Sequence, residues 1–307
     1  MMKPHYSKQV DLLLTVLSDV MRSPDIALKG GTAINLFLLD MPRLSVDIDL
    51  AYLKILPRED SLKAMHDVMT EIAERLSSYP NLKVETKYTQ DRLPKQILVK
   101  QNDISIKIEL NLVIRGAVFD PIPLEICEKA RTLYKKEITV QGLSFEDLYA
   151  GKFCASLDRQ HPRDLFDVLC FFEKFALTEK LKNAFLVYLL STSRPIHEIL
   201  QPSLLDQQAI YESEFESMTD EPITYVQLEQ ARVRLIEMLN KALSPQDKDF
   251  LISFEQGDPQ WDLFPITHAK DLPAVKWKLH NVNQMDAEKR SASVVELERK
   301  LGITMYS

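Results

Sequence analysis

The sequence predicts an α+β protein in which a mixed sheet occupies residues 1–120 and a mainly helical domain occupies residues 121–307. In the first part, apolar and polar residues alternate over several short runs, as they do in strands with one buried face. After Gly142, apolar residues recur at every third or fourth position, which is typical of amphipathic helices. Pro121 and Pro123 interrupt these patterns, so we place the domain boundary near them.

The first part is expected to begin with alternating helices and short strands and to end in a meander of strands. Val10, Leu13 and Leu17 have helical spacing, and the QND segment at 101–103 suits a hairpin turn. The expected elements are helices at 7–21, 33–39 and 59–77, a short apolar segment at 26–28, and strands at 46–52, 82–88, 95–100 and 104–114.

Two helix starts in the second part are marked by capping residues. Ser144 is followed by Asp147, and Ser244 is followed by Pro245 and Asp247, which are favourable combinations for a helix N-terminus. The expected helices lie at 144–157, 163–175, 179–190, 225–243 and 286–301. Three large aromatic residues are expected in the core rather than on an RNA-stacking surface: Trp261, Phe264 and Trp277.

Composition excludes several classes of protein. The net charge of −7 argues against a protein that coats nucleic acid, because such proteins are normally basic. No apolar run approaches the length of a membrane-spanning helix, and the N-terminus does not have the features of a signal peptide. The three cysteines have no CxxC spacing, so we expect reduced thiols, a cytoplasmic location and no structural zinc site.

The segment 83–107 is locally basic. It could form a groove for RNA or an ordinary solvated face, and the solvated face is favoured because surface charge runs are common. Its basic residues are Lys83, Lys87, Arg92, Lys95, Lys100 and Lys107, and its acidic residues are Glu85, Asp91 and Asp103.

Gly30 and Gly31 are the only adjacent glycines in a chain that has seven glycines. Glycine permits unusual backbone angles and lets a ligand approach the main chain closely. A helix that starts near Thr32 would offer its first N–H groups to a phosphate. A tight turn explains the glycine pair equally well.

Asp47 and Asp49 are separated by one residue on a predicted strand, so both side chains should lie on the same face. Neighbouring carboxylates repel each other, and a hard cation such as Mg²⁺ between them would relieve this. Glu109 projects from the polar face of the strand at 104–114. If the two strands are neighbours, three carboxylates meet; otherwise these acids belong to solvated surfaces, with Glu109 near Lys107.

Gly-Gly-Thr at 30–32, followed by RLSVDIDL at 43–50, resembles the nucleotidyltransferase signature of the DNA polymerase β superfamily. More closely, it is similar to the AbiEii/AbiGii toxin family of bacterial toxin–antitoxin and phage-defence systems. The spacing from Thr32 to Asp47 is slightly longer than the commonest spacing in the superfamily, and it fits the toxin branch better than the antibiotic-modifying branch. The resemblance implies a polymerase β-like nucleotidyltransferase fold for the first domain.

Residues 148–171, LYAGKFCASLDRQHPRDLFDVLCF, resemble a later motif of this family, in which a lysine on a helix is followed by Arg-Asp-x-x-Asp. The resemblance implies that Lys152 binds the nucleoside triphosphate (NTP) and that Asp167 is the second essential position. Arg159 and Arg163 would add positive potential. From the residues alone, Asp164 could instead cap the following helix, and Lys152 could be a solvated surface lysine.

The resemblance implies a Mg²⁺-dependent nucleotidyltransferase toxin with a cognate antitoxin as its partner. It implies transfer of a nucleoside monophosphate from an NTP to RNA, such as the tRNA 3′ end, with release of pyrophosphate. The same site could modify a protein or a small molecule, or the protein could be a catalytically silent binding protein. The implied catalytic residues are Asp47, Asp49, Glu109, Lys152 and Asp167, the implied metal ligands are Asp47, Asp49 and Glu109, and the implied nucleotide-binding residues are Gly30, Gly31, Thr32 and Lys152.

Overall fold

The structure is a computed structural model that describes residues 4–90 and 93–303, so Asp91 and Arg92 of the basic segment lie outside the described residues. The chain divides into two compact units. Unit 1 comprises Met1–Leu148 and Glu212–Pro222, and unit 2 comprises Tyr149–Tyr211 and Ile223–Ser307. The sequence places the boundary at residue 120, whereas the structure assigns residues 121–148 to unit 1, because two short strands beyond residue 120 join its sheet.

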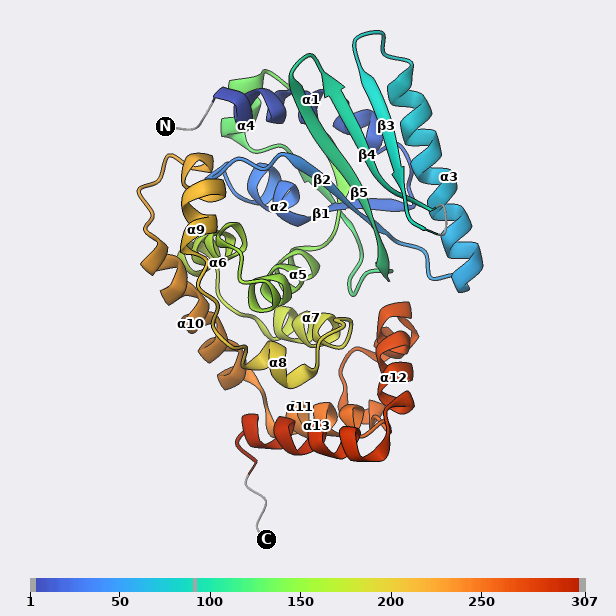
Figure 1. The fold of residues 1–307 in the computed structure, drawn as a ribbon, viewed down its shortest axis with the longest axis vertical. Coiled ribbons are helices and arrows are strands. Elements are labelled where there is room, and N and C mark those ends of the chain that lie inside the picture. The colour runs from blue at the N-terminus through green and yellow to red at the C-terminus, as the bar shows by residue number, and fades with distance from the viewer. Residues whose placement is uncertain (1–3, 91–92, 304–307) are drawn as a thin grey trace. The chain divides into compact units, whose positions relative to one another are not determined.

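The described residues of unit 1 form a mixed seven-stranded sheet in the order β3-β4-β5-β2-β1-β7-β6 (Figure 1). Neighbouring strands are antiparallel except for the parallel pairs β2–β5 and β1–β7. The strands are β1 (Ile26–Lys29), β2 (Asp47–Tyr52), β3 (Lys83–Tyr88), β4 (Pro94–Gln101), β5 (Ile104–Arg115), β6 (Ile122–Glu125) and β7 (Thr139–Gly142), and the helices are α1 (Pro4–Val20), α2 (Gly30–Ala33), α3 (Arg58–Ser77) and α4 (Glu128–Tyr134).

Helices α1 and α3 pack against one face of this sheet (Figure 1). Ile48, Leu50 and Ile108 are buried, whereas the alternating acids Asp49 and Glu109 are only partly buried. Successive side chains of a strand point to opposite faces, so the acids lie on the face away from the apolar side chains. The expected orientation of β2 and β5 is therefore confirmed.

The helix expected at 33–39 begins earlier, at Gly30, and changes from α-helical to π-helical hydrogen bonding. One α-helical turn, α2, continues into a π-helical turn at Ile34–Leu38, in which the Leu39 N–H bonds the Ile34 carbonyl at 2.8 Å. The glycine pair thus forms the first turn of the helix and does not precede it.

Unit 2 is built from helices, as the sequence predicts. Both helix starts that the sequence predicts are present: the Ser144 hydroxyl accepts a hydrogen bond from the Asp147 N–H, and Ser244 and Asp247 form a capping box. The helices are α5 (Phe145–Asp158), whose first residues belong to unit 1, α6 (Pro162–Lys174), α7 (Glu179–Leu189), α8 (Ile196–Leu200), α9 (Gln208–Ile210), α10 (Tyr225–Ala242), α11 (Pro245–Glu255), α12 (Pro273–Gln284) and α13 (Ala287–Lys300). Within the described part of the chain, no helix is long and apolar enough to cross a membrane.

The expected aromatic core of unit 2 is only partly confirmed. Trp261 and Phe264 join Phe250 in an aromatic cluster, in which the Phe250 and Phe264 ring centroids are 4.3 Å apart. The prediction for Trp277 is wrong, because this side chain is 60% exposed and stacks on His280. On α12, Val275 and Lys278 face inward, so the intervening Trp277 faces outward.

Candidate active site

The candidate site is centred on a row of polar side chains that crosses five strands of unit 1. The strand register places Lys87, Gln96, Glu109, Asp49 and Lys29 side by side, in that order, from β3 to β1. Opposed residues on neighbouring strands have Cβ atoms about 5 Å apart, so their side chains interact. The expectation that the strands of Asp49 and Glu109 are neighbours is confirmed.

Asp47 belongs to a second row on the same face. It lies opposite Lys107 of β5, which is exposed. Asp47 and Asp49 are on the same face because they are two residues apart on one strand. Three carboxylates are therefore placed on adjoining positions of two parallel strands, with lysines on both sides.

The glycine pair lies directly against Asp49, in the row of polar side chains that also contains Glu109 (the acidic row). Gly30 has a φ of +74°, and a Cβ atom at this position would be 2.3 Å from Asp49 Oδ2. Only glycine fits here without displacing the carboxylate, and the backbone angle also favours glycine. The pair thus forms a turn in which the Asp49 carboxylate fills the space that a side chain at Gly30 would occupy.

We expect Gly30→Ala to lower nucleotidyl transfer by about 100-fold, because the added methyl group displaces Asp49 and a misplacement of about 1 Å near a reacting centre has an effect of this size. Initial rates with purified protein measure this loss. Gly302→Ala is the matched control, because Gly302 also has a positive φ of +68° but an added Cβ atom there would meet no other atom within 4 Å. Equal activity of the two variants would contradict the role of the close contact.

Two further residues of the RLSVDIDL motif, Arg43 and Ser45, support the turn formed by Gly30 and Gly31. No role for either of them was predicted from the sequence. Arg43 is buried, and its Nη2 would be 2.8 Å from a Cβ atom at Gly31. The Thr32 hydroxyl lies within hydrogen-bond distance of Ser45 Oγ, at 3.0 Å, and of the Asp47 carbonyl, at 2.5 Å. This hydroxyl therefore fastens the turn to β2. In the sequence, the feature that could have pointed to Arg43 and Ser45 is their position a few residues before Asp47.

The donor set on this face fits a hard divalent cation, because carboxylate oxygens are ligands that Mg²⁺ prefers. Among the residues that the structure describes, however, no group of three or more His, Cys, Asp or Glu side chains is already arranged around a common metal position. Glu109 accepts a hydrogen bond from Gln96 of β4, which holds its carboxylate toward that strand. Binding of a cation by all three acids would require Glu109 to turn toward Asp49.

The second motif forms a buried ion cluster inside unit 2. Lys152 of α5 is 6% exposed, and its Nζ lies 2.7 Å from Asp164 Oδ1 and 2.8 Å from Asp167 Oδ2 of α6. Arg159 Nε contacts the other Asp164 oxygen at 2.5 Å. Lys152 is therefore not a solvated surface lysine, and the side chain that caps α6 is His161, not Asp164.

The charges of this cluster depend on one another. Burial alone would raise the pKa of the Asp164 carboxyl, but Lys152 and Arg159 outweigh it and hold the pKa well below its usual range. Burial also raises the pKa of the neighbouring Tyr149 hydroxyl, with the nearby Asp167 adding to the effect. The lowered pKa of Asp164, together with its short ion pairs, indicates that this carboxyl is ionised at neutral pH.

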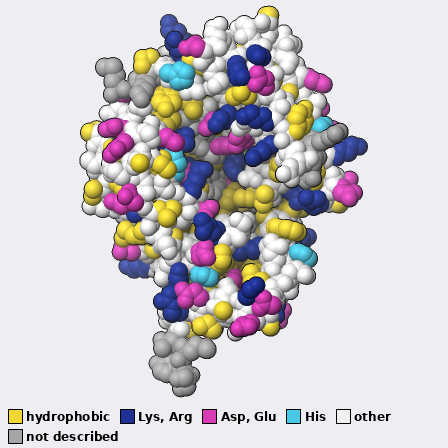
Figure 2. Space-filling model, in the orientation of Figure 1, with side chains coloured by type: hydrophobic (Ala, Val, Ile, Leu, Met, Phe, Trp, Pro, Cys, Tyr) yellow, Lys and Arg dark blue, Asp and Glu magenta, His cyan; other side chains and the backbone are white. Residues whose placement is uncertain are grey.

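The basic segment is partly neutralised by acids. Glu85 lies 3.0 Å from Lys100 Nζ and 3.4 Å from Lys83 Nζ, and these two lysines lower its pKa, with the larger effect from Lys100. Over the strands of unit 1, Figure 2 shows basic side chains interspersed with acidic ones. Within the described residues of the segment, Lys87, Lys95 and Lys107 are the exposed lysines that remain outside these ion pairs.

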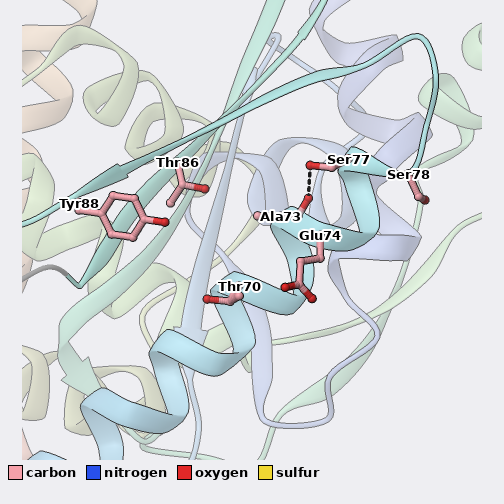
Figure 3. A pocket seen from close by; sticks show the side chains of 7 residues that line it. All are labelled: Thr70, Ala73, Glu74, Ser77, Ser78, Thr86 and Tyr88. Atoms are coloured by element: carbon pink, nitrogen blue, oxygen red, sulfur yellow. Dashed lines mark hydrogen bonds between the residues drawn. The ribbon is translucent and has the colours of Figure 1, made fainter.

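A separate pocket of about 500 Å³ lies between α3 and the edge strand β3 (Figure 3). Its wall carries Thr70, Glu74 and Ser77 from the helix and Thr86 and Tyr88 from the strand. Thr86 and Tyr88 alternate with Lys87 along β3, so this pocket is on the opposite face of the sheet from the acidic row. It does not contribute to the candidate active site.

A family model described as "Nucleotidyl transferase AbiEii toxin, Type IV TA system" matches residues 11–281, which is most of the chain. The chain belongs to the AbiEii nucleotidyl transferase toxin family. The resemblance that begins with Gly30 and Gly31 and includes Asp47-Ile48-Asp49 (the DxD motif) is therefore confirmed, and the match extends over a much longer part of the sequence. Membership in the AbiEii family makes the protein a nucleotidyltransferase, and it implies an NTP substrate and an antitoxin partner.

One solved structure supports the fold of this AbiEii protein. MenT4, a nucleotidyltransferase toxin from Mycobacterium tuberculosis H37Rv, matches with a TM-score of 0.62 and 16% identity, over 90% of this chain and 92% of that chain. At this identity the likeness concerns the fold alone, and it agrees with the predicted α+β class.

Two further matches have much lower structural similarity. The GLD-2/RNP-8 complex matches with a TM-score of 0.27 and 14% identity, over 78% of each chain. Terminal uridylyl transferase 4 from Trypanosoma brucei with bound GTP matches with a TM-score of 0.26 and 12% identity, over 78% of this chain and 93% of that chain. At these TM-scores neither match bears on the fold or the function of the AbiEii chain. No curated protein matches the AbiEii chain.

Proposed function

We propose that this AbiEii toxin transfers a nucleoside monophosphate from an NTP to an RNA acceptor, such as the tRNA 3′ end, at the acidic face of unit 1. The observation that carries the proposal is the register of β2 and β5, which pairs Asp49 with Glu109 and keeps Asp47 on the same face. The close contact between Gly30 and Asp49 supports it, because it places main-chain groups for a phosphate beside carboxylates for a metal.

Each residue of the site has a separate task in this proposal. Asp47 and Asp49 would hold Mg²⁺, and Glu109 would complete the ligand set. When Glu109 releases its hydrogen bond from Gln96, its carboxylate can accept the proton of the attacking hydroxyl. Mg²⁺ bound there supplies charge neutralisation for the triphosphate and lowers the pKa of the attacking group. Gly30 and Gly31, with the main chain of Thr32, bind the triphosphate.

Lys152 and Asp167 are proposed as the second part of the nucleotide-binding machinery, on the strength of the motif that they share with the AbiEii family. The cluster of Lys152, Asp164 and Asp167 fixes the position of the ammonium within unit 2. Because the ammonium is buried and paired with two carboxylates, it binds a phosphate in this proposal only when one of these contacts is replaced by a phosphate oxygen. Arg159, which is largely exposed, adds positive charge beside it.

An RNA acceptor is favoured because lysines surround the acids on the polar face of the sheet. Lys29 and Lys87 end the row that contains Asp49, and Lys107 lies opposite Asp47. Phosphodiester backbones bind lysine side chains through charge neutralisation and release of counterions. We also propose, from its membership in the AbiEii family, that the protein acts in the cytoplasm and in phage defence.

The test incubates the intact protein with Mg²⁺, total tRNA and each α-³²P-labelled NTP in turn. Label in RNA is the expected result, and its loss at high salt is expected if lysines bind the backbone. Label in protein or in a small molecule would instead support the alternative acceptors. The absence of label with all four NTPs would contradict catalytic turnover and favour a silent binding protein.

A further inference from the structure

A segment from the second half of the sequence lies beside the loop that leads into the DxD strand. This segment, residues 215–219, is called the strap, and it belongs to unit 1 although the residues on both sides of 212–222 belong to unit 2. Thr219 forms an isolated antiparallel bridge with Arg43. The strap therefore reaches a loop that lies far earlier in the chain, with a sequence separation of 177 between Thr219 and Pro42.

Two hydrogen bonds fasten the strap to this loop. The Leu44 N–H donates to the Met218 carbonyl at 2.8 Å, and Thr219 Oγ1 donates to the Pro42 carbonyl at 2.9 Å. Phe215 and Met218 are buried, so the strap is also held by apolar packing. The strap is therefore held to residues 42–44 by polar contacts as well as by apolar packing.

The loop held by the strap continues directly into the candidate site. Arg43 is 3% exposed, its Nη1 donates to the Leu44 carbonyl at 3.0 Å, and its guanidinium lies against Gly31. Two residues later, Ser45 contacts the hydroxyl of Thr32, which also reaches the Asp47 carbonyl. The contacts thus run without a break from the strap to the glycine turn and the first aspartate.

We propose that the strap positions the nucleotide site, with Thr219 and Arg43 as positioning residues that do not touch the substrate. The residues that precede and follow the strap also contact each other: the Tyr211 hydroxyl donates a hydrogen bond to the Ile223 carbonyl at 2.6 Å. Movement of residues 42–45 would shift Gly31 and Asp47, and with them the groups that face the triphosphate. This inference rests on the proposed placement of the nucleotide beside Gly30 and Asp49.

The test uses three substitutions in the intact chain. Thr219→Val keeps the shape of the side chain but removes its hydrogen bonds, Thr219→Ser keeps the hydroxyl, and Thr224→Val removes a helix-capping threonine of unit 2 that lies a short way along the same segment. Two quantities are measured for each protein: amide hydrogen exchange at residues 30–32 and 43–47, and the affinity for each of the four NTPs with Mg²⁺ by calorimetric titration.

Thr219→Val should raise both the exchange rates and the dissociation constant for the NTP by about three- to tenfold, the effect of losing the one hydrogen bond that Thr219 donates to the loop, at Pro42. Thr219→Ser should restore both values, and Thr224→Val should change neither. Unchanged exchange in Thr219→Val would overturn the inference, as would faster exchange with unchanged NTP affinity. Retained activity in Asp49→Asn would instead refute the proposed site itself, so the two failures are distinguishable.

Discussion

Asp49→Asn should reduce nucleotidyl transfer by about a thousandfold. The substitution removes one negative charge from the acidic row but preserves the size of the side chain beside Gly30. A metal held by carboxylates contributes several kcal/mol of transition-state stabilisation, and each 1.4 kcal/mol corresponds to about a tenfold change in rate. The measurement is the initial rate of label transfer from the NTP that the wild-type protein uses.

Asp103→Asn is the matched control for this prediction. Asp103 is exposed in the turn between β4 and β5, so the same change of charge is made at the end of a strand that also carries the site. Its activity should remain within about twofold of the wild-type value, since exposed substitutions seldom alter a site at a distance. A rate for Asp49→Asn above one tenth of the wild-type rate would refute the assignment of Asp49 as a metal ligand.

Lys152→Met should destabilise unit 2 by about 3–5 kcal/mol at neutral pH. The substitution leaves Asp164 and Asp167, which are 2% and 0% exposed in their side chains, buried without their shared ammonium group. Removal of one partner from a buried ion pair is costly because the remaining charge is uncompensated. Chemical unfolding without nucleotide measures the effect separately from any loss of nucleotide binding.

The destabilisation should depend on pH in a defined direction. In the wild-type protein the pKa of Asp164 is lowered by Lys152 and Arg159, so this group contributes stability above the ordinary carboxyl range, and that stability is lost as the pH falls. Without Lys152, only Arg159 opposes the effect of burial, which favours the protonated acid. The difference in unfolding free energy between wild type and variant should therefore be largest at neutral pH and shrink as the pH falls below about 4, the ordinary carboxyl pKa.

Two variants control this second prediction. Lys174→Met changes an exposed lysine at the end of α6 and should cost less than about 0.5 kcal/mol. Combining Lys152→Met with Asp164→Asn and Asp167→Asn removes the uncompensated charges, and it should recover part of the lost stability. A pH-independent loss in Lys152→Met would show that packing, and not charge, explains the effect.

The candidate site of unit 1 was predictable because strand periodicity is a local signal. The alternation around Asp49 and Glu109 fixed which side chains share a face, and the strand pairing then confirmed that they are neighbours. The glycine pair was also informative from the sequence, but its purpose depended on the contact with Asp49, which is separated from Gly30 by a whole loop.

Other features could not be predicted because their causes are distant in the sequence. Strands β6 and β7 are only four residues long, so they carry too little pattern to show that they extend the sheet. The burial of Lys152 follows from its pairing with Asp164 and Asp167, and a sequence motif does not state exposure. Trp277 shows the reverse case, in which a large aromatic residue is left at the surface.

The strap has a consequence for the order in which the protein is completed during synthesis. Translation proceeds from the N-terminus, and domains generally fold as units while the chain emerges. The segment up to Leu148 contains the whole sheet and the DxD motif, yet Leu44 receives its partner only after Met218 has been made. A nascent or truncated chain that ends before the strap therefore carries every proposed acid of unit 1 but lacks the segment that secures their loop.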